Sequence, residues 1–352
     1  MRIVVAQTSF LGDVVLSTPV FAALKRRWPE SHLTAWLRPE AAAVLAGHPH
    51  VDAVLVDDKR GADRGLRGLM RLRARLRAER FDLAVALHKS LRTAVLLALA
   101  GVPRRVGFRQ SAGWFLYPER VNRDPTCHDV ERNLSIVSAL GIDPKQGSPR
   151  LLVVPTSSAC DRVAALLREA NVGEQQPLVG IAPGSTWATK RWTVEGYAEA
   201  VRSLAAEGYG VLLFGAPNEG GIADRVNQMA GGVALNLVGR TDVGMLVAAI
   251  DRVQVLLCND SAPMHIAVAR DIPVVAVFGP THPQQGYGPY SVRATVVQRD
   301  DLDCRPCGRH GAAVCPIATH ACMVGINAAT VLAAARRLLD ARVVARPHLV
   351  AP

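Results

Sequence analysis

The stretch MRIVVAQTSFLGDVVLSTPVFAALKRR, Met1–Arg27, predicts the first unit of the fold. Its opening residues form an apolar run that is typical of a buried parallel strand. Residues 18–28 follow a helical pattern, so the stretch predicts a strand, a turn and a helix. The turn holds a single glycine, Gly12, beside an acid, Asp13. An acid is poorly suited to holding phosphate, which is what a glycine-rich turn does at this place in dinucleotide-binding sheets.

Apolar runs and helical patterns alternate along the rest of the chain, which predicts parallel, doubly wound α/β sheets. Further predicted strands are 32–38, 53–58, 83–88, 104–108, 177–182, 211–217, 235–239, 253–260 and 272–280. Further predicted helices are 41–46, 66–80, 90–99, 194–210, 222–230, 243–253, 261–270 and 328–342.

The length of 352 residues favours two domains over one core. Residues 142–156 are rich in proline, glycine and serine, so we expect the linker there. The predicted domains are 1–155 and 156–352. Ligands bind at the carboxyl ends of the strands in such sheets, so we expect two Rossmann-like domains facing each other across a cleft.

Positive charge is concentrated in the first half of the chain. Residues 1–150 contain 24 Lys/Arg against 14 Asp/Glu, whereas the remainder contains 17 against 16. This excess favours an anionic partner, although a solvated basic surface is equally compatible with composition alone. No apolar run approaches the roughly 20 residues of a membrane span, and the N-terminus does not resemble a signal peptide. We therefore expect a cytoplasmic protein.

The basic segment Lys59–Arg80 contains nine Lys/Arg and two acids. Helical spacing relates four of its arginines: Arg60, Arg64, Arg67 and Arg71. We expect the apolar side chains between them to face the protein body; these are Leu66, Leu69, Met70 and Leu76.

Two segments of the second half place polar groups after strands. IAPGSTWATKRW, 181–192, offers hydroxyls and cations after a strand, which suits a pyrophosphate. In VQVLLCNDSAPMHIAVA, 253–269, Asp260 or Ser261 is a candidate N-cap for a helix whose amides could bind an anion. A solvated loop and an ordinary core histidine, His265, are the alternatives. Glu219 in FGAPNEG could hold ribose hydroxyls.

Together, PGSTWATKRW, FGAPNE, LVGRTD and NDSAPMHIAVARDIPVVAVFGPTHP resemble the donor-binding half of the ADP-heptose:lipopolysaccharide heptosyltransferases, glycosyltransferase family 9. TSFLGDVVLSTP and HDVERN resemble its N-terminal and middle segments, so the resemblance covers nearly the whole chain. It implies the GT-B fold, with an acceptor-binding N-terminal and an ADP-sugar-binding C-terminal domain. It also implies inverting transfer of L-glycero-D-manno-heptose from ADP-heptose to the inner core of lipopolysaccharide.

The resemblance implies that Asp13 is the general base, consistent with the need for one base opposite the leaving ADP. The alternative is a simple N-cap for the following helix. Catalytic roles are also implied for Lys190 and His265. The implied donor-binding residues are Gly12, Ser185, Thr186, Lys190, Glu219, Thr241, Asp260, Ser261, Ala262 and His265.

The resemblance further implies a phosphorylated, lipid-linked saccharide acceptor at the cytoplasmic face of the inner membrane. A cationic surface would suit it. The implied acceptor- or membrane-facing residues are Arg60, Arg64, Arg67, Arg71, Lys89 and Arg92, and Arg92 stands where the family has a lysine. The alternative for the arginines is a solvated surface.

No cofactor is expected for catalysis. The one DxD motif, Asp301–Asp303, lies late in the chain, and we interpret it as surface. Four cysteines cluster: Cys304, Cys307, Cys315 and Cys322. Their spacing is compatible with a structural zinc or iron site, with reduced thiols, or with disulfides. We expect the other three, Cys127, Cys160 and Cys258, to be ordinary core residues.

The cysteine cluster favours the heptosyltransferase II branch, which adds the second heptose. Two alternatives remain. A related transferase could use another acceptor, such as protein or another glycan, or another nucleotide sugar. A basic nucleic-acid-binding protein is a remote alternative, because aromatic residues make up only 5% of the chain and offer few stacking platforms. We expect no nucleic-acid partner.

Overall fold

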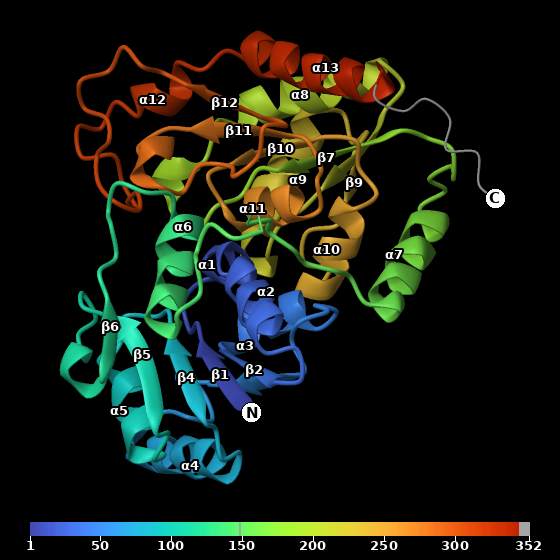
Figure 1. The fold of residues 1–352 in the computed structure, drawn as a ribbon. Coiled ribbons are helices and arrows are strands. Elements are labelled where there is room, and N and C mark those ends of the chain that lie inside the picture. Colours follow the sequence, from blue (N-terminus) through green and yellow to red (C-terminus); the bar gives the residue numbers. More distant parts are fainter. Residues whose placement is uncertain (148, 345–352) are drawn as a thin grey trace. The chain divides into compact units, whose positions relative to one another are not determined.

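The computed structural model describes residues 1–147 and 149–344. Ser148 of the predicted linker and residues 345–352 of the predicted second domain lie outside the described residues. The chain divides into two compact units, Met1–Pro155 and Thr156–Pro352 (Figure 1). Within the described residues, each unit contains a six-stranded parallel sheet covered by helices. The predicted α/β class with two Rossmann-like domains is confirmed.

The sheet of the first unit has the strand order β3-β2-β1-β4-β5-β6. Its strands are β1 (Arg2–Ala6), β2 (His32–Leu37), β3 (Ala53–Val56), β4 (Leu83–Ala86), β5 (Arg104–Phe108) and β6 (Glu119–Val121). The order reverses between β1 and β4, and connections leave to opposite sides there. The carboxyl ends of these two strands are therefore the place where such a sheet binds its ligand.

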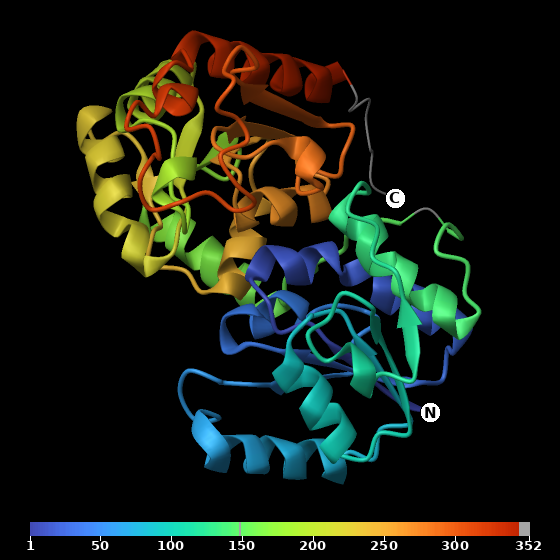
Figure 2. The same ribbon diagram turned by 90° about the vertical axis from the view of Figure 1, so that its left-hand side faces the viewer.

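The helices of the first unit form two layers. They are α1 (Leu11–Leu16), α2 (Thr18–Arg27), α3 (Pro39–Ala42), α4 (Gly65–Ala78), α5 (Leu91–Leu99) and α6 (Asp129–Leu134), with short 3-10 turns η1 (Ala43–Leu45), η2 (Trp114–Leu116) and η3 (Ser135–Leu140). Figures 1 and 2 show α4 and α5 on one side of the sheet and α1, α2 and α6 on the other. Leu72 and Leu76 of α4 pack with Val4 and Ala84 of the sheet in one apolar core.

The sheet of the second unit has the order β12-β11-β10-β7-β8-β9. Its strands are β7 (Leu178–Ala182), β8 (Gly210–Leu213), β9 (Leu235–Asn236), β10 (Leu256–Asn259), β11 (Val274–Phe278) and β12 (Ala294–Gln298). Its helices are α7 (Ser157–Glu169), α8 (Val194–Ala206), α9 (Gly220–Met229), α10 (Val243–Ile250), α11 (Ala262–Ala269), α12 (Ala321–Val324) and α13 (Ala328–Val344), with η4 (Ala188–Lys190), η5 (Pro217–Glu219) and η6 (Pro283–Gln285).

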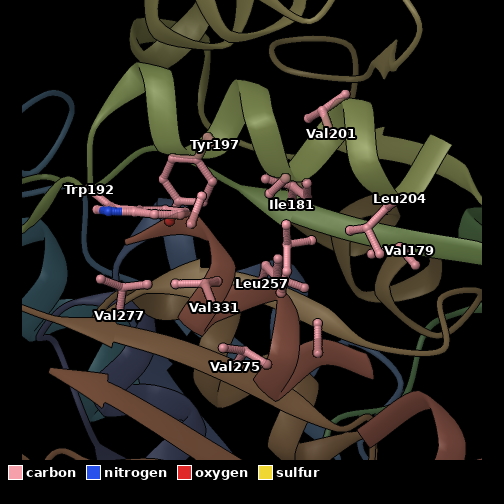
Figure 3. Close-up of a cluster of buried hydrophobic side chains, with 14 of the residues drawn as sticks. Val179, Ile181, Trp192, Tyr197, Val201, Leu204, Leu257, Val275, Val277 and Val331 are labelled. Carbon is pink, nitrogen blue, oxygen red and sulfur yellow. The ribbon is translucent and has the colours of Figure 1, made fainter. Parts of the chain in front are cut away.

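The core of the second unit packs α8 and α13 against the sheet (Figure 3). In this cluster Tyr197 extends from α8 toward Trp192, and the two rings meet edge to face with centroids 4.9 Å apart. Such a pair contributes about 0.5–1.5 kcal/mol beyond the apolar area that it buries. Trp192 lies two residues after Lys190, so the core fixes the end of the segment that carries this lysine.

One prediction about α4 is wrong for two of its four apolar residues, whereas Leu76 is buried and Leu69 packs against the core as expected. The buried positions of this helix are Gly68, Leu72 and Leu76, spaced four residues apart along one side. Leu66 and Met70 lie on the other side of the helix and are exposed. The basic segment therefore presents apolar and cationic side chains together on its outer surface. Within the described residues, no helix is long and apolar enough to cross a membrane.

Candidate active site

Asp13 lies in the first turn of α1, directly beyond the carboxyl end of the central strand β1. Its Oδ2 accepts a hydrogen bond from the Phe10 amide at 3.1 Å. Burial raises the pKa of Asp13 to about 6, and the nearby Asp129 carboxylate adds to the increase, whereas the Phe10 amide, Arg123 and Lys89 oppose it. A carboxyl group with this pKa is suited to accepting a proton near neutral pH.

The capping alternative for Asp13 is partly realised, but on a different helix. The bond to Phe10 stabilises the start of α1, a short helix that the sequence did not predict, rather than α2. Gly12 precedes Asp13 in the same turn. Capping uses one carboxylate oxygen, and the other can accept a proton.

The HDVERN segment forms α6, which contacts α1. Within it, Asp129 is buried and pairs with Arg123, and its second oxygen accepts a hydrogen bond from Asn133 Nδ2 at 3.0 Å. This pairing holds a second carboxyl group in place close to Asp13. This segment resembles the family's middle segment, but nothing in the sequence singles out Asp129.

Thr8 and His88 lie where the strand order reverses, after β1 and β4. Thr8 Oγ1 hydrogen-bonds His88 Nδ1 at 2.8 Å, and Lys59 Nζ donates to the Thr8 carbonyl at 3.3 Å. Burial lowers the pKa of His88 to about 4, and nearby cations add to the decrease, so the ring is neutral at physiological pH. The sequence did not single out this network, because its members are up to 80 residues apart.

The predicted acceptor-facing cations differ in their surroundings. Arg92 is paired with buried Asp57, Nη2 to Oδ1 3.1 Å, and also donates to the Asp63 carbonyl. Its charge is therefore largely engaged within the unit. Arg60 precedes α4 and Arg64 occupies its N-cap, so the predicted helical row is shorter than expected. The exposed members of the set are Arg60, Arg64, Arg67, Arg71 and Lys89.

In the second unit, Lys190 and Asp260 form an ion pair with Nζ and Oδ2 2.6 Å apart. The same oxygen accepts a hydrogen bond from Thr281 Oγ1 at 2.7 Å. Both charged side chains are nearly buried, at 12% and 7% exposure. The pair joins the two segments that the sequence selected for the donor. Thr281, which follows β11, was not predicted as a site residue.

Asn259, fully buried at the end of β10, holds these segments in place. Its Oδ1 accepts from the Trp192 amide and the Tyr197 hydroxyl, both at 2.9 Å. Its Nδ2 donates to the carbonyls of Pro183 and Gly184 at 2.9 and 3.1 Å. The side chain thus uses its full amide capacity, and it fixes the PGST turn relative to the segment that carries Lys190.

Three of the residues predicted for the donor, Ser185, Thr186 and Glu219, lie at this turn. Ser185 is buried and Thr186 is exposed. Glu219 accepts from the Ala216 amide at 2.8 Å, and its carboxyl group lies so close to Gly184 that a Cβ there would overlap it. Thr241 is half-buried after β9, on the same edge of the sheet.

The start of α11 differs in one detail from the prediction. Ser261 occupies the N-cap, but its side chain makes no cap bond, because its Oγ donates to the Asn259 carbonyl at 3.3 Å instead. Asp260 is held by Lys190 and Thr281, so it does not cap the helix either. Ala262 begins α11, and His265 is buried one turn further along.

The cysteine-bearing loop, residues 304–322, contacts the donor segments. Thr189 and Ala312 exchange hydrogen bonds, and His320 Nε2 lies 2.8 Å from the Thr189 carbonyl. The Cys307 amide donates to the Pro280 carbonyl at 2.8 Å. The loop therefore supports Lys190 from one side and the segment before Thr281 from another.

The cysteines themselves are free thiols, so the disulfide alternative is not realised. Backbone amides of residues 317–320 lower the pKa of Cys315, whereas burial raises that of Cys322. Among the described residues, no group of three or more His, Cys, Asp or Glu is arranged to hold a metal ion. The structural metal site is therefore without support. Of the three cysteines predicted for the core, Cys258 is buried and Cys127 is half-buried, whereas Cys160 is exposed and was wrongly assigned.

The DxD segment lies on the surface. Asp301 and Asp303 are exposed, and Asp301 pairs with the neighbouring Arg299. The interpretation of this motif as a surface feature is confirmed.

The sequence matches the family model for glycosyltransferase family 9 (heptosyltransferase) over residues 69–317. The lipopolysaccharide heptosyltransferase 2 of Salmonella typhimurium is 30% identical over 305 residues, covering 80% of this chain and 84% of that protein. The lipopolysaccharide heptosyltransferase 3 of Escherichia coli is 30% identical over 282 residues, covering 77% and 82%. The chain belongs to glycosyltransferase family 9, and the predicted family is confirmed.

Solved structures agree with this assignment. The glycosyl transferase family 9 structure from Veillonella parvula DSM 2008 superposes with a TM-score of 0.87 at 26% identity, covering 97% of each chain. The structure of E. coli ADP-heptose lps heptosyltransferase II superposes with a TM-score of 0.80 at 23% identity, covering 97% of this chain and 99% of that one. The protein is a glycosyltransferase of the GT-B class.

Proposed function

We propose that this enzyme transfers L-glycero-D-manno-heptose from ADP-heptose to the inner core of lipopolysaccharide, adding the second heptose, with Asp13 as general base. The observation that carries the catalytic part is the position and the raised pKa of Asp13. Similarity to a heptosyltransferase 2 over 80% of the chain supports the choice of substrates.

In this mechanism the acceptor hydroxyl loses its proton to Asp13 while its oxygen forms a bond to C1 of the heptose. The bond between C1 and the β-phosphate oxygen breaks, and ADP leaves on the opposite face with the bonding electrons. The configuration at C1 is therefore inverted. The lowered pKa of His88 makes its ring a poor proton acceptor, so it does not compete with Asp13 for the proton.

On the donor side, the PGST turn and the start of α11 would bind the diphosphate. Ser185 and Thr186 offer hydroxyls, Lys190 offers charge, and His265 would stabilise the leaving phosphate. Glu219 and Thr241 would contact the adenosine, and Asp260 the heptose hydroxyls. A lysine and helix amides can balance the charge that develops on ADP, so the proposed reaction requires no metal ion.

On the acceptor side, Arg60, Arg64, Arg67, Arg71 and Lys89 would meet a phosphorylated, lipid-linked saccharide. Such an acceptor places the enzyme on the cytoplasmic face of the inner membrane as a peripheral protein. The engaged Arg92 would position Asp57 and the loop before α4 rather than contact the acceptor directly.

The test is transfer from ADP-L-glycero-β-D-manno-heptose to inner-core acceptors that carry no heptose, one heptose or two heptoses, each with and without EDTA. We expect turnover on the mono-heptosylated acceptor alone, and no effect of EDTA. Equal identity to a heptosyltransferase 3 favours a later transfer as the second candidate. Turnover only on the di-heptosylated acceptor would establish that candidate, and binding of ADP-heptose without any turnover would point to a different acceptor.

A further inference from the structure

Several large apolar side chains of the first unit are exposed on α4, α5 and η2, which are connected through α5. Phe115 and Leu66 are 61% and 76% exposed, and three others are about half exposed. We name the set the apolar rim: Leu66, Met70, Leu91, Trp114 and Phe115. Leaving such side chains in water costs free energy at about 25 cal/mol per Å², so a cluster of them indicates a surface that is covered in use.

The apolar rim lies at the carboxyl-end edge of the first sheet. Strands of a parallel sheet share a direction, and each helix returns to the opposite edge, so helices begin where strands end. Leu66 and Met70 lie in the first two turns of α4, and Leu91 begins α5. η2 follows β5, contacts α5, and places Gly113 against Leu91.

Cations accompany the α4 and η2 parts of the rim. On α4, Leu66 and Met70 alternate with Arg67 and Arg71, because residues four apart share a helix face. At η2, the Arg120 guanidinium lies over the Trp114 ring, 5.3 Å from its centroid. No acid occurs between Arg64 and Ala78. The α4 part of this surface therefore combines apolar side chains with positive charge and no acid.

This combination favours a lipid surface over a protein partner. A protein interface commonly has an apolar centre depleted in charge, with a polar rim. Here arginines lie beside Leu66 and Met70 on α4 and over the Trp114 ring. Aromatic rings enter the headgroup region of a bilayer, and arginines at that depth contact anionic lipids. Asp13 follows β1 at this same edge of the sheet.

We propose that the apolar rim docks this enzyme on an anionic bilayer, with Trp114 and Phe115 inserted among the lipid headgroups. The inference rests on the proposed function only in that a lipid-linked acceptor explains why the docking edge and Asp13 coincide. Arg67, Arg71 and Arg120 supply attraction to lipid phosphates. The inserted rings supply the affinity that persists at physiological salt.

The test measures co-sedimentation of the full chain, without substrates, on phosphatidylcholine vesicles with and without roughly one third phosphatidylglycerol. We expect binding to the anionic vesicles only. Trp114→Ser with Phe115→Ser should weaken partitioning at least tenfold, and Arg67→Glu with Arg71→Glu should abolish it. The matched control changes exposed apolar residues of the second unit, Met229→Ser with Val233→Ser, and should bind as the parent does.

A second measurement keeps the test valid if the serine double variant fails to fold. Lipids brominated near the headgroup should quench part of the tryptophan fluorescence of the parent, and Trp114→Phe should lose that quenching while it still binds. Unchanged binding of the serine variant, equal binding to neutral vesicles, or quenching that survives Trp114→Phe would each overturn the proposal. So would a dimer of the parent that dissociates in the serine variant. If the parent enzyme binds the vesicles but transfers no heptose, the proposed function is contradicted instead.

Discussion

Lys190 and Asp260 are joined by a nearly buried ion pair in which Nζ and Oδ2 lie 2.6 Å apart. The lysine that would face an anionic diphosphate is thus held by a carboxylate whose position is itself fixed by Thr281. The pair directs the ammonium group and limits the rotamers open to it. The donor would then find the cation already placed, at the cost of sharing it with Asp260.

Replacing Lys190 should affect both binding and stability. Lys190→Ala should weaken ADP-heptose binding by roughly 1.5–3 kcal/mol, the scale of a charged hydrogen bond. It also leaves Asp260 buried without its partner, which should lower the free energy of unfolding by roughly 3 kcal/mol. Isothermal titration and thermal melting measure the two effects.

The double variant Lys190→Ala with Asp260→Asn separates these effects. It removes the unpaired charge, so it should recover most of the lost melting temperature while donor affinity stays low. The exposed Lys145→Ala serves as the control. Donor affinity that returns together with stability would show that Lys190 acts only through the fold.

Asp13 should give the reaction a single acidic limb in its pH profile. Below the pKa of about 6 the carboxyl group holds a proton and cannot accept another. kcat/KM should therefore fall tenfold for each pH unit below that value. Asp13→Asn should lower kcat by roughly 10²- to 10⁴-fold and leave ADP affinity within a few-fold. A variant with parental turnover, or an acidic limb that it retains, would remove Asp13 as the base.

The same residue should reduce stability at neutral pH. Its raised pKa means that the folded protein holds the proton more tightly than the unfolded chain, so ionisation of Asp13 weakens folding between about pH 4 and pH 6. Asp13→Asn should therefore stabilise the protein at about pH 7.5 relative to about pH 4, by roughly 1–2 kcal/mol after allowance for partial exposure. Denaturant unfolding at both pH values checks this difference, and equal effects at both would contradict it.

Asn259 should be essential for order in the donor segments. Asn259→Asp keeps the shape but replaces two donors with carboxylate oxygen that faces the carbonyls of Pro183 and Gly184. We expect a loss of roughly 2–5 kcal/mol in stability, or a raised donor KM with acceptor KM unchanged where the variant folds. The exposed Asn122→Asp is the control, and a parental donor KM in Asn259→Asp would refute this role.

The alternation of long apolar runs predicted most strands of both sheets, because strands buried on two faces need continuous hydrophobic sequence. β6 and β12 were missed. The first is short and begins Glu119-Arg120, and the second lies at the edge of its sheet, where apolar residues are less necessary. Leu66 and Met70 were misplaced because helical spacing alone did not show which stripe of α4 the glycine and leucines would bury.

The candidate site was predictable where polar residues directly follow an apolar run, as for Asp13 and Asp260. It was not predictable where a residue acts through distant partners. Asn259 stood next to Asp260 in the sequence, at the end of a strand, but its partners are 62 to 76 residues away. The roles of Thr281 and His88 likewise depend on the order in which the strands assemble.

The four contacts between Thr189 and the cysteine-bearing loop join positions more than a hundred residues apart. A protease that cut this loop near Ala312 would free the chain on which Thr189 depends, and Lys190 is the next residue. Limited proteolysis should therefore remove donor binding at the same rate as it removes the intact loop. A cut at the exposed Gly231–Gly232 turn has no such connection. Integrity of a cysteine-rich surface loop is in this way a condition for holding a nucleotide sugar.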